Sequence, residues 1–399
     1  MINRPNYIKA IAPFIDQPLV KILAGIRRGG KSTIFEMLEE ELLRRGVSAD
    51  HIICKRYTEM DIPENITAKQ MYDELLEAMV GKGHCYLLLD EIQEIIGWER
   101  AVNSLLEGAD ADIYVTGSNS KLMSSEISTY LTGRYVSIPV YTLSFREYLD
   151  FKADSTLTRK ELLEEYIRFG GFPIIALSQY DAQNAYQIVN GIYHTVVSRD
   201  VVKRHRINKQ DLFDRVVKFI IENVGKTFSA NSISTFLKSE HRKVSVESIY
   251  NYLRWLEQAF IIYPCERYDL QGKSILKTQE KYYLADVSLK YALLGYNRKM
   301  LDGAMENIVF LELKRRGYDV YIGKNDTKEI DFVATRRDER IYVQVCVQLP
   351  VGSDREVGNL MEIRDHYPKY VVTLNDMVVG VENGIKIVHL QDFLLAETW

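Results

Sequence analysis

Residues 21–35 read KILAGIRRGGKSTIF, and the segment from Gly25 to Ser32 matches the pattern G-x-x-x-x-G-K-[ST] in full. The apolar residues 18–24 before it predict a strand. The apolar residues after it recur at helical spacing: Ile34, Met37, Leu38 and Leu42. A turn from a strand into a helix points backbone N–H groups and the positive end of the helix dipole at an anion. Glycines let the backbone close around that anion because they carry no Cβ. The segment therefore predicts a phosphate-binding loop.

The loop supplies candidate ligands for ATP and Mg²⁺. In this pattern the lysine reaches the β- and γ-phosphates and the following hydroxyl lies on the metal, so these roles fall to Lys31 and Ser32. The predicted nucleotide-binding residues are Gly25, Ile26, Arg27, Arg28, Gly29, Gly30, Lys31, Ser32 and Thr33.

A second candidate site element lies about sixty residues further on. Residues 85–89 form a continuous apolar run, typical of a strand buried on both faces of a parallel sheet, and Asp90 and Glu91 follow it. Two adjacent carboxylates at such a strand end need a cation or solvent, because burying an unpaired charge is costly. We expect Asp90 to hold Mg²⁺, partly through water, opposite Ser32, and Glu91 to act as the general base on the attacking water.

Two further polar positions are candidates for catalysis. The strand predicted at 112–119 ends in polar residues, of which Asn119, with Ser118 close behind, is expected to touch the γ-phosphate or orient water; a simple turn is the alternative. Arg134 is a candidate arginine finger, in cis or from a neighbouring subunit, because a planar guanidinium can stabilise transferring phosphoryl oxygens. A structural salt bridge is the alternative role for Arg134.

The composition is that of an ordinary globular protein. The 399 residues carry a formal net charge of -4, which gives no global reason to expect nucleic acid or an anionic membrane as partner. The four cysteines form no C-x-x-C pair, which favours reduced core thiols. The N-terminus lacks the apolar core of a signal peptide, and no apolar run is long enough to span a membrane. We expect a cytoplasmic protein with no membrane association.

The order of predicted elements indicates four parts. Strands and helices alternate over residues 1–153, which predicts an α/β domain with a doubly wound parallel sheet. Residues 154–207 are predicted to be a helical lid. Residues 208–278 show three helices followed by a hairpin around residues 271–273, the outline of a winged helix. Residues 279–399 alternate again.

Several motifs together resemble one family. Besides the phosphate loop and YLLLDEIQ at 86–93, they are TGSNS at 116–120, LTGRY at 131–135, LSF at 143–145 and GGFP at 170–173. The chain resembles the prokaryotic AAA-type (AAA_14-like) P-loop ATPases whose C-terminal half is a DUF4143 domain. That resemblance implies an AAA-like (ASCE) P-loop NTPase sheet, then a helical and winged-helix region, then a C-terminal domain similar to the PD-(D/E)xK nuclease fold. It also implies self-association into a homo-oligomer, by analogy.

The C-terminal domain departs from the nuclease pattern. Glu306, Asp331 and Gln344 stand where a degenerate nuclease site would lie, but a nuclease needs a second carboxylate in place of Gln344 and a lysine in place of Cys346. Glutamine is a poorer metal ligand, and cysteine cannot replace the charge of lysine. The nuclease-like fold is still predicted, whereas nuclease activity is less well supported. Lys324 or Lys328 could substitute for the missing lysine.

The sequence thus predicts an ATP-dependent switch whose output is open. Gly170 and Gly171, followed by Pro173, form either a hinge or a fixed tight turn. Residues 199–209 are the most basic run and, with Lys238 and residues 241–243, could form a DNA-binding face. Three outputs remain: a double-stranded DNA-associated ATPase, a switch that holds a protein partner, and, with least support, an active metal-dependent nuclease.

Overall fold

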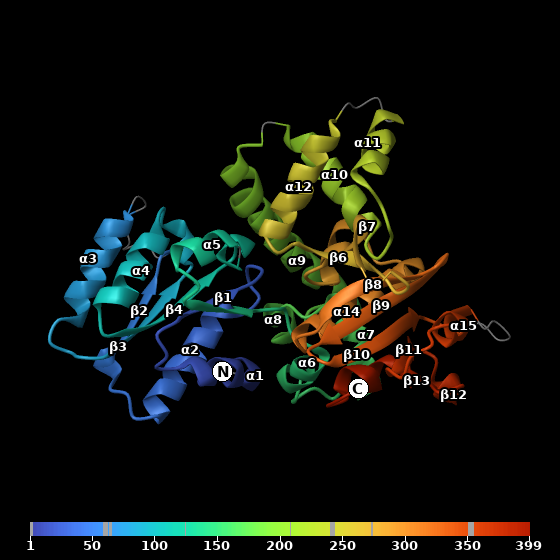
Figure 1. The fold of residues 1–399 in the computed structure, drawn as a ribbon, viewed down its shortest axis with the longest axis horizontal. Helices are drawn as coiled ribbons and strands as arrows, with labels where there is room; N and C mark the ends of the chain where they lie inside the picture. Colours follow the sequence, from blue (N-terminus) through green and yellow to red (C-terminus); the bar gives the residue numbers. More distant parts are fainter. Residues whose placement is uncertain are drawn as a thin grey trace. The chain divides into compact units, whose positions relative to one another are not determined.

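The computed structural model describes residues 3–399 apart from 59–62, 64, 65, 124, 208, 240–243, 273 and 350–354. The chain divides into two compact units, Met1–Val140 with Gln258–Phe260, and Tyr141–Glu257 with Ile261–Trp399. Figure 1 shows the elements of each along the chain.

The first unit is built on a five-stranded sheet in the order β2-β3-β4-β1-β5. Its strands are β1 (Val20–Ala24), β2 (Ile52–Arg56), β3 (Cys85–Asp90), β4 (Ala111–Gly117) and β5 (Tyr135–Pro139). Every pairing in this sheet is parallel. Because parallel strands end at the same sheet edge, the residues after β1, β3 and β4 share one edge. The predicted parallel α/β sheet is confirmed.

Helices cover the faces of this sheet (Figure 1). They are α1 (Pro5–Ile11), α2 (Lys31–Arg44), α3 (Ala68–Met79), α4 (Trp98–Gly108) and α5 (Ser125–Tyr130), with 3-10 turns η1 (Ala12–Phe14), η2 (Ala49–His51), η3 (Ile92–Glu94) and η4 (Ser120–Met123). The apolar face of α2, with Ile34, Leu38 and Leu42, packs in one buried cluster with Leu23 and Tyr114 of the sheet. The first residue of α2 is Lys31.

The second unit begins with helices. They are α6 (Phe145–Phe151), α7 (Arg159–Phe169), α8 (Pro173–Ala176), α9 (Ala182–Val196), the π-helix η5 (Val197–Lys203), α10 (Gln210–Glu222), α11 (Ala230–Ser239) and α12 (Val246–Gln258). Three start at capping residues whose side chains accept a hydrogen bond from the first turn: Ser144, Thr158 and Asp181.

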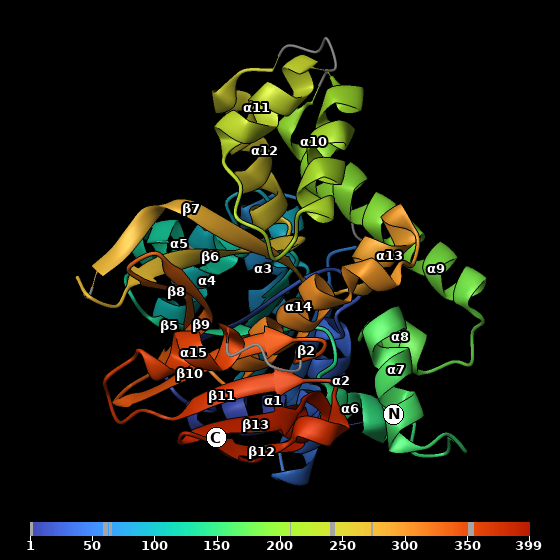
Figure 2. The ribbon, with the colours of Figure 1, turned by 90° about the vertical axis from the view of Figure 1, so that its right-hand side faces the viewer.

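An eight-stranded mixed sheet completes the second unit, in the order β12-β13-β11-β10-β9-β8-β6-β7 (Figure 2). Its strands are β6 (Ile262–Asp269), β7 (Ser274–Leu284), β8 (Asp319–Asn325), β9 (Lys328–Arg336), β10 (Glu339–Cys346), β11 (Lys369–Thr373), β12 (Gly380–Glu382) and β13 (Ile385–His389). The helices that follow its strands are α13 (Ser288–Leu294), α14 (Leu301–Arg315), α15 (Arg355–Met361) and α16 (Leu390–Leu395), with short turns η6 (Arg298–Met300) and η7 (Asp376–Val378).

The hairpin predicted around residues 271–273 is formed by β6 and β7, but it belongs to this large sheet. β6 pairs with β8 in parallel through Arg267, Tyr268 and Asp269. The predicted domain limit at residue 278 is therefore corrected, because it would cut the continuous strand β7. The limits at 153 and 207 stay predictions.

Gly170 and Gly171 lie in a tightly packed turn. A Cβ on Gly170 would lie 1.7 Å from Asp286 Oδ1, and one on Gly171 would lie 2.4 Å from the Leu143 carbonyl oxygen. Asp286 is buried and accepts hydrogen bonds from the Gly171 N–H at 2.8 Å and from Ser288. Burial raises the pKa of Asp286 although these donors lower it. The arrangement is that of the fixed tight turn.

All four cysteines are free thiols, with Cys54 exposed and Cys85, Cys265 and Cys346 buried. Within the described ranges, no helix combines the length and apolar character that crossing a bilayer requires.

Candidate nucleotide-binding site

The phosphate loop connects β1 to α2 with a backbone that requires glycine at two positions. A Cβ on Gly25 would lie 1.9 Å from the Val140 carbonyl oxygen, so only glycine fits there. Gly30 has φ 99°, in the left-handed region that favours glycine. Arg28 also has a left-handed backbone, with φ 65°. Packing therefore requires glycine at Gly25 and backbone conformation favours it at Gly30, whereas closure of the loop around a phosphate stays a prediction.

Lys31 lies inside the loop. Its side chain is 3% exposed, and its Nζ donates to the carbonyl oxygens of Gly25 at 3.0 Å and Ile26 at 3.1 Å. The same Nζ is 3.8 Å from Glu91 Oε1. The positive charge therefore lies between the loop and the acid at the end of β3.

The loop is also held from the N-terminal segment, by Arg4. This arginine is 2% exposed, and its Nη1 donates to the Gly29 carbonyl oxygen at 2.9 Å. Its guanidinium lies 4.5 Å from the centre of the Tyr7 ring. Sequence reasoning did not find Arg4, because it lies twenty-five residues from its partner and belongs to no motif.

Asp90 is the acceptor for several side chains at the end of β3. Ser32 Oγ donates to its Oδ2 at 2.7 Å, and the Thr116 hydroxyl donates to its Oδ1. Arg56 Nε lies 3.2 Å from Oδ2. The structure therefore brings together Ser32 and Asp90, the two predicted metal ligands, which lie 58 residues apart.

These two oxygen donors suit Mg²⁺. The ion favours one or two protein oxygen ligands with phosphate and water oxygens completing its octahedron, so a hydroxyl beside one carboxylate is sufficient. Among the described residues, no group of three or more His, Cys, Asp or Glu side chains is arranged to hold a metal ion. The hydroxyl of Ser32 and the carboxylate of Asp90 are ligands that a nucleotide-bound Mg²⁺ accepts.

Glu91 has an unusual backbone and a dense set of partners. Its φ is 55°, and its side chain accepts hydrogen bonds from Gln93 and from Ser118 Oγ, the latter at 3.2 Å. Arg27 Nη1 lies 3.4 Å from Glu91 Oε2. Burial raises the pKa of Glu91, but the nearby positive charges of Lys31 and Arg27 lower it by more than burial raises it. The pKa of this carboxyl is therefore held below its usual range. Glu91 is therefore kept ionised, as a general base requires.

Of the remaining predicted residues, Ser118 and Asn119 lie at the same sheet edge as Glu91, whereas Arg134 lies at the other edge of the sheet. Ser118, the second choice in the sequence, contacts Glu91, and Asn119 follows it at 3% exposure. Arg134 precedes β5, whose first residue pairs with Val20 at the start of β1, so it lies at the sheet edge opposite to the loop. Five strand residues separate the two edges by roughly 16 Å. The cis arginine-finger role is therefore corrected. In this chain Arg134 binds Asn103 and Glu107, the salt-bridge alternative.

The C-terminal acids also come together, around a lysine that the sequence did not indicate. Lys281 Nζ lies 3.4 Å from Glu306, 2.9 Å from Glu329 and 3.9 Å from Asp331. Gln344 Oε1 accepts a hydrogen bond from the Asp331 N–H at 3.3 Å. Lys281 of this cluster lies on β7. Glu329, the second carboxylate, lies on β9 together with Asp331.

The two lysines that the sequence suggested as substitutes lie elsewhere. Lys328 pairs with the exposed Glu362, and Lys324 lies on β8. Burial raises the pKa values of Asp331 and Glu306, and the proximity of Glu306 raises that of Asp331 further. Glu306, Glu329 and Asp331 thus surround Lys281, whose positive charge partly neutralises theirs.

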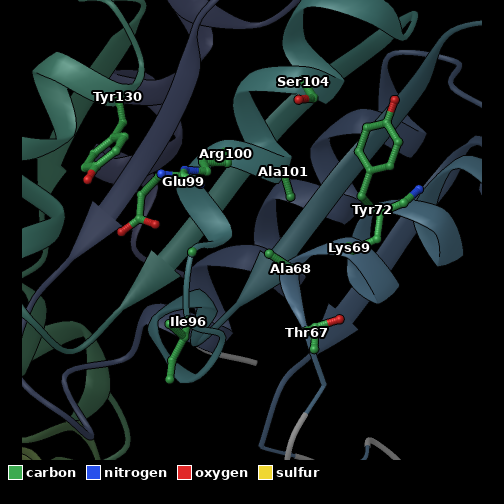
Figure 3. Close-up of a pocket in the computed structure, with 11 residues that line it drawn as sticks. Thr67, Ala68, Lys69, Tyr72, Ile96, Glu99, Arg100, Ala101, Ser104 and Tyr130 are labelled. Atoms are coloured by element: carbon green, nitrogen blue, oxygen red, sulfur yellow. The ribbon is translucent and has the colours of Figure 1, made fainter.

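A cavity of about 930 Å³ lies elsewhere in the first unit, between the start of α3 and α4 (Figure 3). Thr67, Lys69 and Tyr72 line one side, and Glu99 and Arg100 line the other. None of its described lining residues belongs to the phosphate loop, so this cavity is distinct from the candidate nucleotide site.

Comparisons with known proteins agree with the first unit and leave one expectation for the second unconfirmed. A family model described as an AAA domain matches residues 17–149. A model described as a domain of unknown function, DUF8612, matches residues 160–299. The DUF4143 domain that the resemblance implied for the C-terminal half is not confirmed, because the model that matches there is described as DUF8612.

Two curated relatives match most of the chain. An uncharacterized protein of Haemophilus influenzae is 35% identical over 399 residues, 99% of each chain. An uncharacterized protein of Methanocaldococcus jannaschii is 32% identical over 371 residues, 90% of this chain and 80% of the relative.

A solved structure supports the fold. The Walker-type ATPase paby2304 of Pyrococcus abyssi aligns with a TM-score of 0.53 at 15% identity, over 73% of this chain and 96% of that one. The chain therefore belongs to the same family as the two curated relatives, and its residues 17–149 match an AAA domain.

Proposed function

We propose that the chain binds ATP with Mg²⁺ at the phosphate loop and hydrolyses it. One observation carries the proposal: Ser32 Oγ lies 2.7 Å from Asp90 Oδ2, while Lys31 faces the neighbouring Glu91. A proposed metal-ligand pair, a proposed phosphate-binding cation and an ionised acid are thus gathered where α2 begins and β3 ends. These are the groups that phosphoryl transfer to water needs.

Each residue has a defined role in this proposal. Lys31 and the loop N–H groups bind the β- and γ-phosphates, and Ser32 and Asp90 hold Mg²⁺, which neutralises developing charge on the phosphate oxygens when bound. Glu91 accepts the proton of the attacking water. Ser118 orients Glu91 through its hydroxyl, and Asn119 is proposed to contact the γ-phosphate or the water.

ATP turnover and binding of a fluorescent ATP analogue test this function. We expect the wild type to hydrolyse ATP only with Mg²⁺, and Lys31→Ala to lose both binding and turnover. The matched control is Lys9→Ala, an exposed lysine at the end of α1. Unchanged turnover in Lys31→Ala would show that the site is assigned wrongly.

For the output, we propose that hydrolysis drives a conformational switch that acts on double-stranded DNA. The supporting observation is the basic surface at the end of α9, where Arg199, Lys203 and Arg206 are exposed on and just after the π-helix η5. π-helical segments are rare and often mark functional sites. The predicted contacts at residues 241–243 lie outside the described residues.

DNA-stimulated turnover separates the two outputs. If the protein acts on DNA, duplex DNA should raise ATP turnover, and this stimulation should fall steeply as the salt concentration rises. The triple variant Arg199→Gln, Lys203→Gln, Arg206→Gln should reduce the slope of log affinity against log salt concentration by about two or three. If DNA has no effect, the alternative of a protein partner is favoured. The supporting observation for that alternative is the exposure of Phe236 on α11 and Tyr250 on α12, at 42% and 55%.

We propose the PD-(D/E)xK-like fold for the C-terminal strands, with a structural rather than a catalytic role for their acids. The supporting observation is the ion pairing of Glu306, Glu329 and Asp331 with Lys281. Incubation of duplex and single-stranded DNA with Mg²⁺ or Mn²⁺ tests this role, and we expect no cleavage. Cleavage that disappears in Asp331→Ala would restore the nuclease alternative.

Self-association is part of the proposal for Arg134. Arg134 could contact bound ATP only in a neighbouring chain, so we propose a homo-oligomer in which it does so. We expect Arg134→Ala to lower ATP turnover only at protein concentrations at which the chains associate. Sedimentation velocity, run beside the turnover assay, measures both.

A further inference from the structure

Asp90 has a positively charged neighbour that belongs to none of the sequence motifs. Arg56 Nε lies 3.2 Å from Asp90 Oδ2, the oxygen to which Ser32 Oγ also donates. Arg56 is the last residue of β2, and it stands opposite Asp90 in the register of β2 and β3. Strand pairing in the sheet therefore places this guanidinium beside the proposed metal ligand.

The two partners differ in their freedom to move. The side chain of Asp90 is 6% exposed, and its second oxygen accepts the Thr116 hydroxyl. The side chain of Arg56 is 46% exposed. A cavity of about 170 Å³, lined in part by Ser32, Arg56 and Asp90, borders the pair. Arg56 can thus leave the carboxylate by side-chain rotation, whereas Asp90 is fixed.

Asp90 Oδ2 already accepts hydrogen bonds from Ser32 Oγ and Arg56 Nε, so a magnesium ion that coordinates this oxygen directly takes the place of one of these donors. Mg²⁺ requires oxygen ligands at about 2.0–2.1 Å in near-octahedral geometry. A second cation on the same carboxylate would also be repelled by the first. Direct coordination of Mg²⁺ by Asp90 Oδ2, with Ser32 as the second protein ligand, therefore displaces Arg56.

We propose that Arg56 and Mg²⁺ exchange on Asp90, and that the displaced guanidinium binds the terminal phosphate oxygens of the nucleotide. This inference rests on the proposed ATPase function. Arg56 is within reach of a nucleotide held by Lys31 and Ser32, because Ser32 and Arg56 contact the same oxygen of Asp90 and line the same cavity. A planar, permanently charged guanidinium suits phosphoryl oxygens. Arg56 therefore positions Asp90 when Mg²⁺ is absent and contacts the nucleotide when Mg²⁺ is bound.

The test is the Mg²⁺ dependence of ATP turnover in Arg56→Gln. We expect the Mg²⁺ concentration for half-maximal rate to fall by about three- to tenfold, because the competitor is gone. We expect the maximal rate to fall by about tenfold or more, because a phosphate contact is lost. Arg56→Lys keeps the charge and should restore the Mg²⁺ requirement but only part of the rate. Electron paramagnetic resonance of Mn²⁺ with a non-hydrolysable ATP analogue measures the metal affinity without turnover.

Lys55→Gln is the matched control, because it removes the same charge from the preceding residue of β2. Lys55 pairs with Glu74 rather than with Asp90, so its loss should change neither quantity. An unchanged or higher Mg²⁺ requirement in Arg56→Gln would overturn the exchange, and so would an unchanged maximal rate. A wild type that hydrolyses no ATP would contradict the proposed function instead, and the Mn²⁺ titration would still decide the exchange.

Discussion

At the scale of single residues, the candidate site is organised by pairs of opposite charge. Asp90 is contacted by Arg56, and Glu91 by Arg27 and Lys31. Lys31 and Arg27 hold the pKa of the buried Glu91 carboxyl below its usual range, so Glu91 stays ionised. The chemistry therefore depends on residues outside the recognised motif positions as well as on those within them.

Glu91→Gln should separate binding from hydrolysis. The amide keeps the size of the side chain but cannot accept a proton, so ATP turnover should fall by about 10²- to 10⁴-fold. Affinity for ATP should stay within about threefold of wild type or rise, because Lys31 loses its acidic neighbour. Single-turnover kinetics and analogue binding measure the two quantities, and a parallel loss of both would contradict the role of general base.

Arg4→Met should weaken ATP binding from outside the motif. The substitution leaves the Gly29 carbonyl oxygen without the donor that fixes it, so the loop loses part of its preorganised shape. A hydrogen bond to a charged group contributes about 1.5–3 kcal/mol, which predicts a loss of affinity of about tenfold or more. Isothermal titration with an ATP analogue measures it. Lys9→Met, on the exposed end of α1, is the control that should bind normally.

At the scale of elements, turns and strand pairings fix groups that lie far apart in sequence. The turn at Gly170 and Gly171 packs against Asp286, which precedes α13 by two residues. Lys281 joins β7 to β9 and α14 through three carboxylates. Both features stabilise the second unit by pairing buried polar groups.

Gly170→Ala should destabilise the second unit strongly. The new Cβ would lie 1.7 Å from Asp286 Oδ1, and alanine is strained at φ 74°. We expect a loss of at least about 3 kcal/mol in the free energy of unfolding, measured by urea denaturation. Gly191→Ala, in an open position on α9, is the matched control and should stabilise the helix by about 0.5–1 kcal/mol. Equal effects of the two changes would favour a flexible hinge instead.

Lys281→Met should destabilise the second unit in a pH-dependent manner. Removing the lysine leaves Glu306 and Asp331 without their cation, which costs about 3–5 kcal/mol when such a pair is buried, whereas Glu329 keeps its ion pair with Arg267. The loss raises the pKa values of Glu306 and Asp331, which burial has already raised, so folding of the variant favours their protonated forms.

The defect of Lys281→Met should therefore be smallest at acidic pH and grow as the pH rises through these raised pKa values. Urea denaturation at pH 5 and pH 8 measures it. Lys328→Met removes an exposed pair with Glu362 and should cost less than about 1 kcal/mol at both pH values. A defect of Lys281→Met that shrinks with rising pH would contradict this role of the lysine.

At the scale of the whole molecule, each of the two units has its own sheet and its own buried core. The proposed ATP site lies entirely within the first unit, since all its residues precede Val140. Binding of ATP should therefore act directly on the stability of that unit.

A non-hydrolysable ATP analogue with Mg²⁺ should raise the unfolding temperature of the first unit. At a free concentration of 100 times the dissociation constant, the stabilisation is about 2.7 kcal/mol, which is several degrees for a unit of this size. Differential scanning calorimetry measures the shift. It should disappear in Lys31→Ala and persist in Asp331→Ala, and a shift that depended on Asp331 instead would place the nucleotide in the second unit.

The sequence by itself determined the phosphate loop, the acids at the end of β3 and the parallel sheet that presents them. These follow from neighbouring residues, because a loop that binds phosphate needs glycines at fixed spacing and a strand buried on both faces must be continuously apolar. Ser32 and Asp90 were likewise predictable as partners, since both follow strands that end at one sheet edge.

Only the tertiary structure decided which distant residues join these motifs. Arg4, Arg56 and Lys281 carry no local signal, and they reach Gly29, Asp90 and the C-terminal acids through packing and strand order. Strand order also placed Arg134 at the wrong edge for a role in its own chain. The physical reason is that local sequence sets backbone conformation and burial, whereas contacts between side chains far apart along the chain depend on which strands pair and in what register.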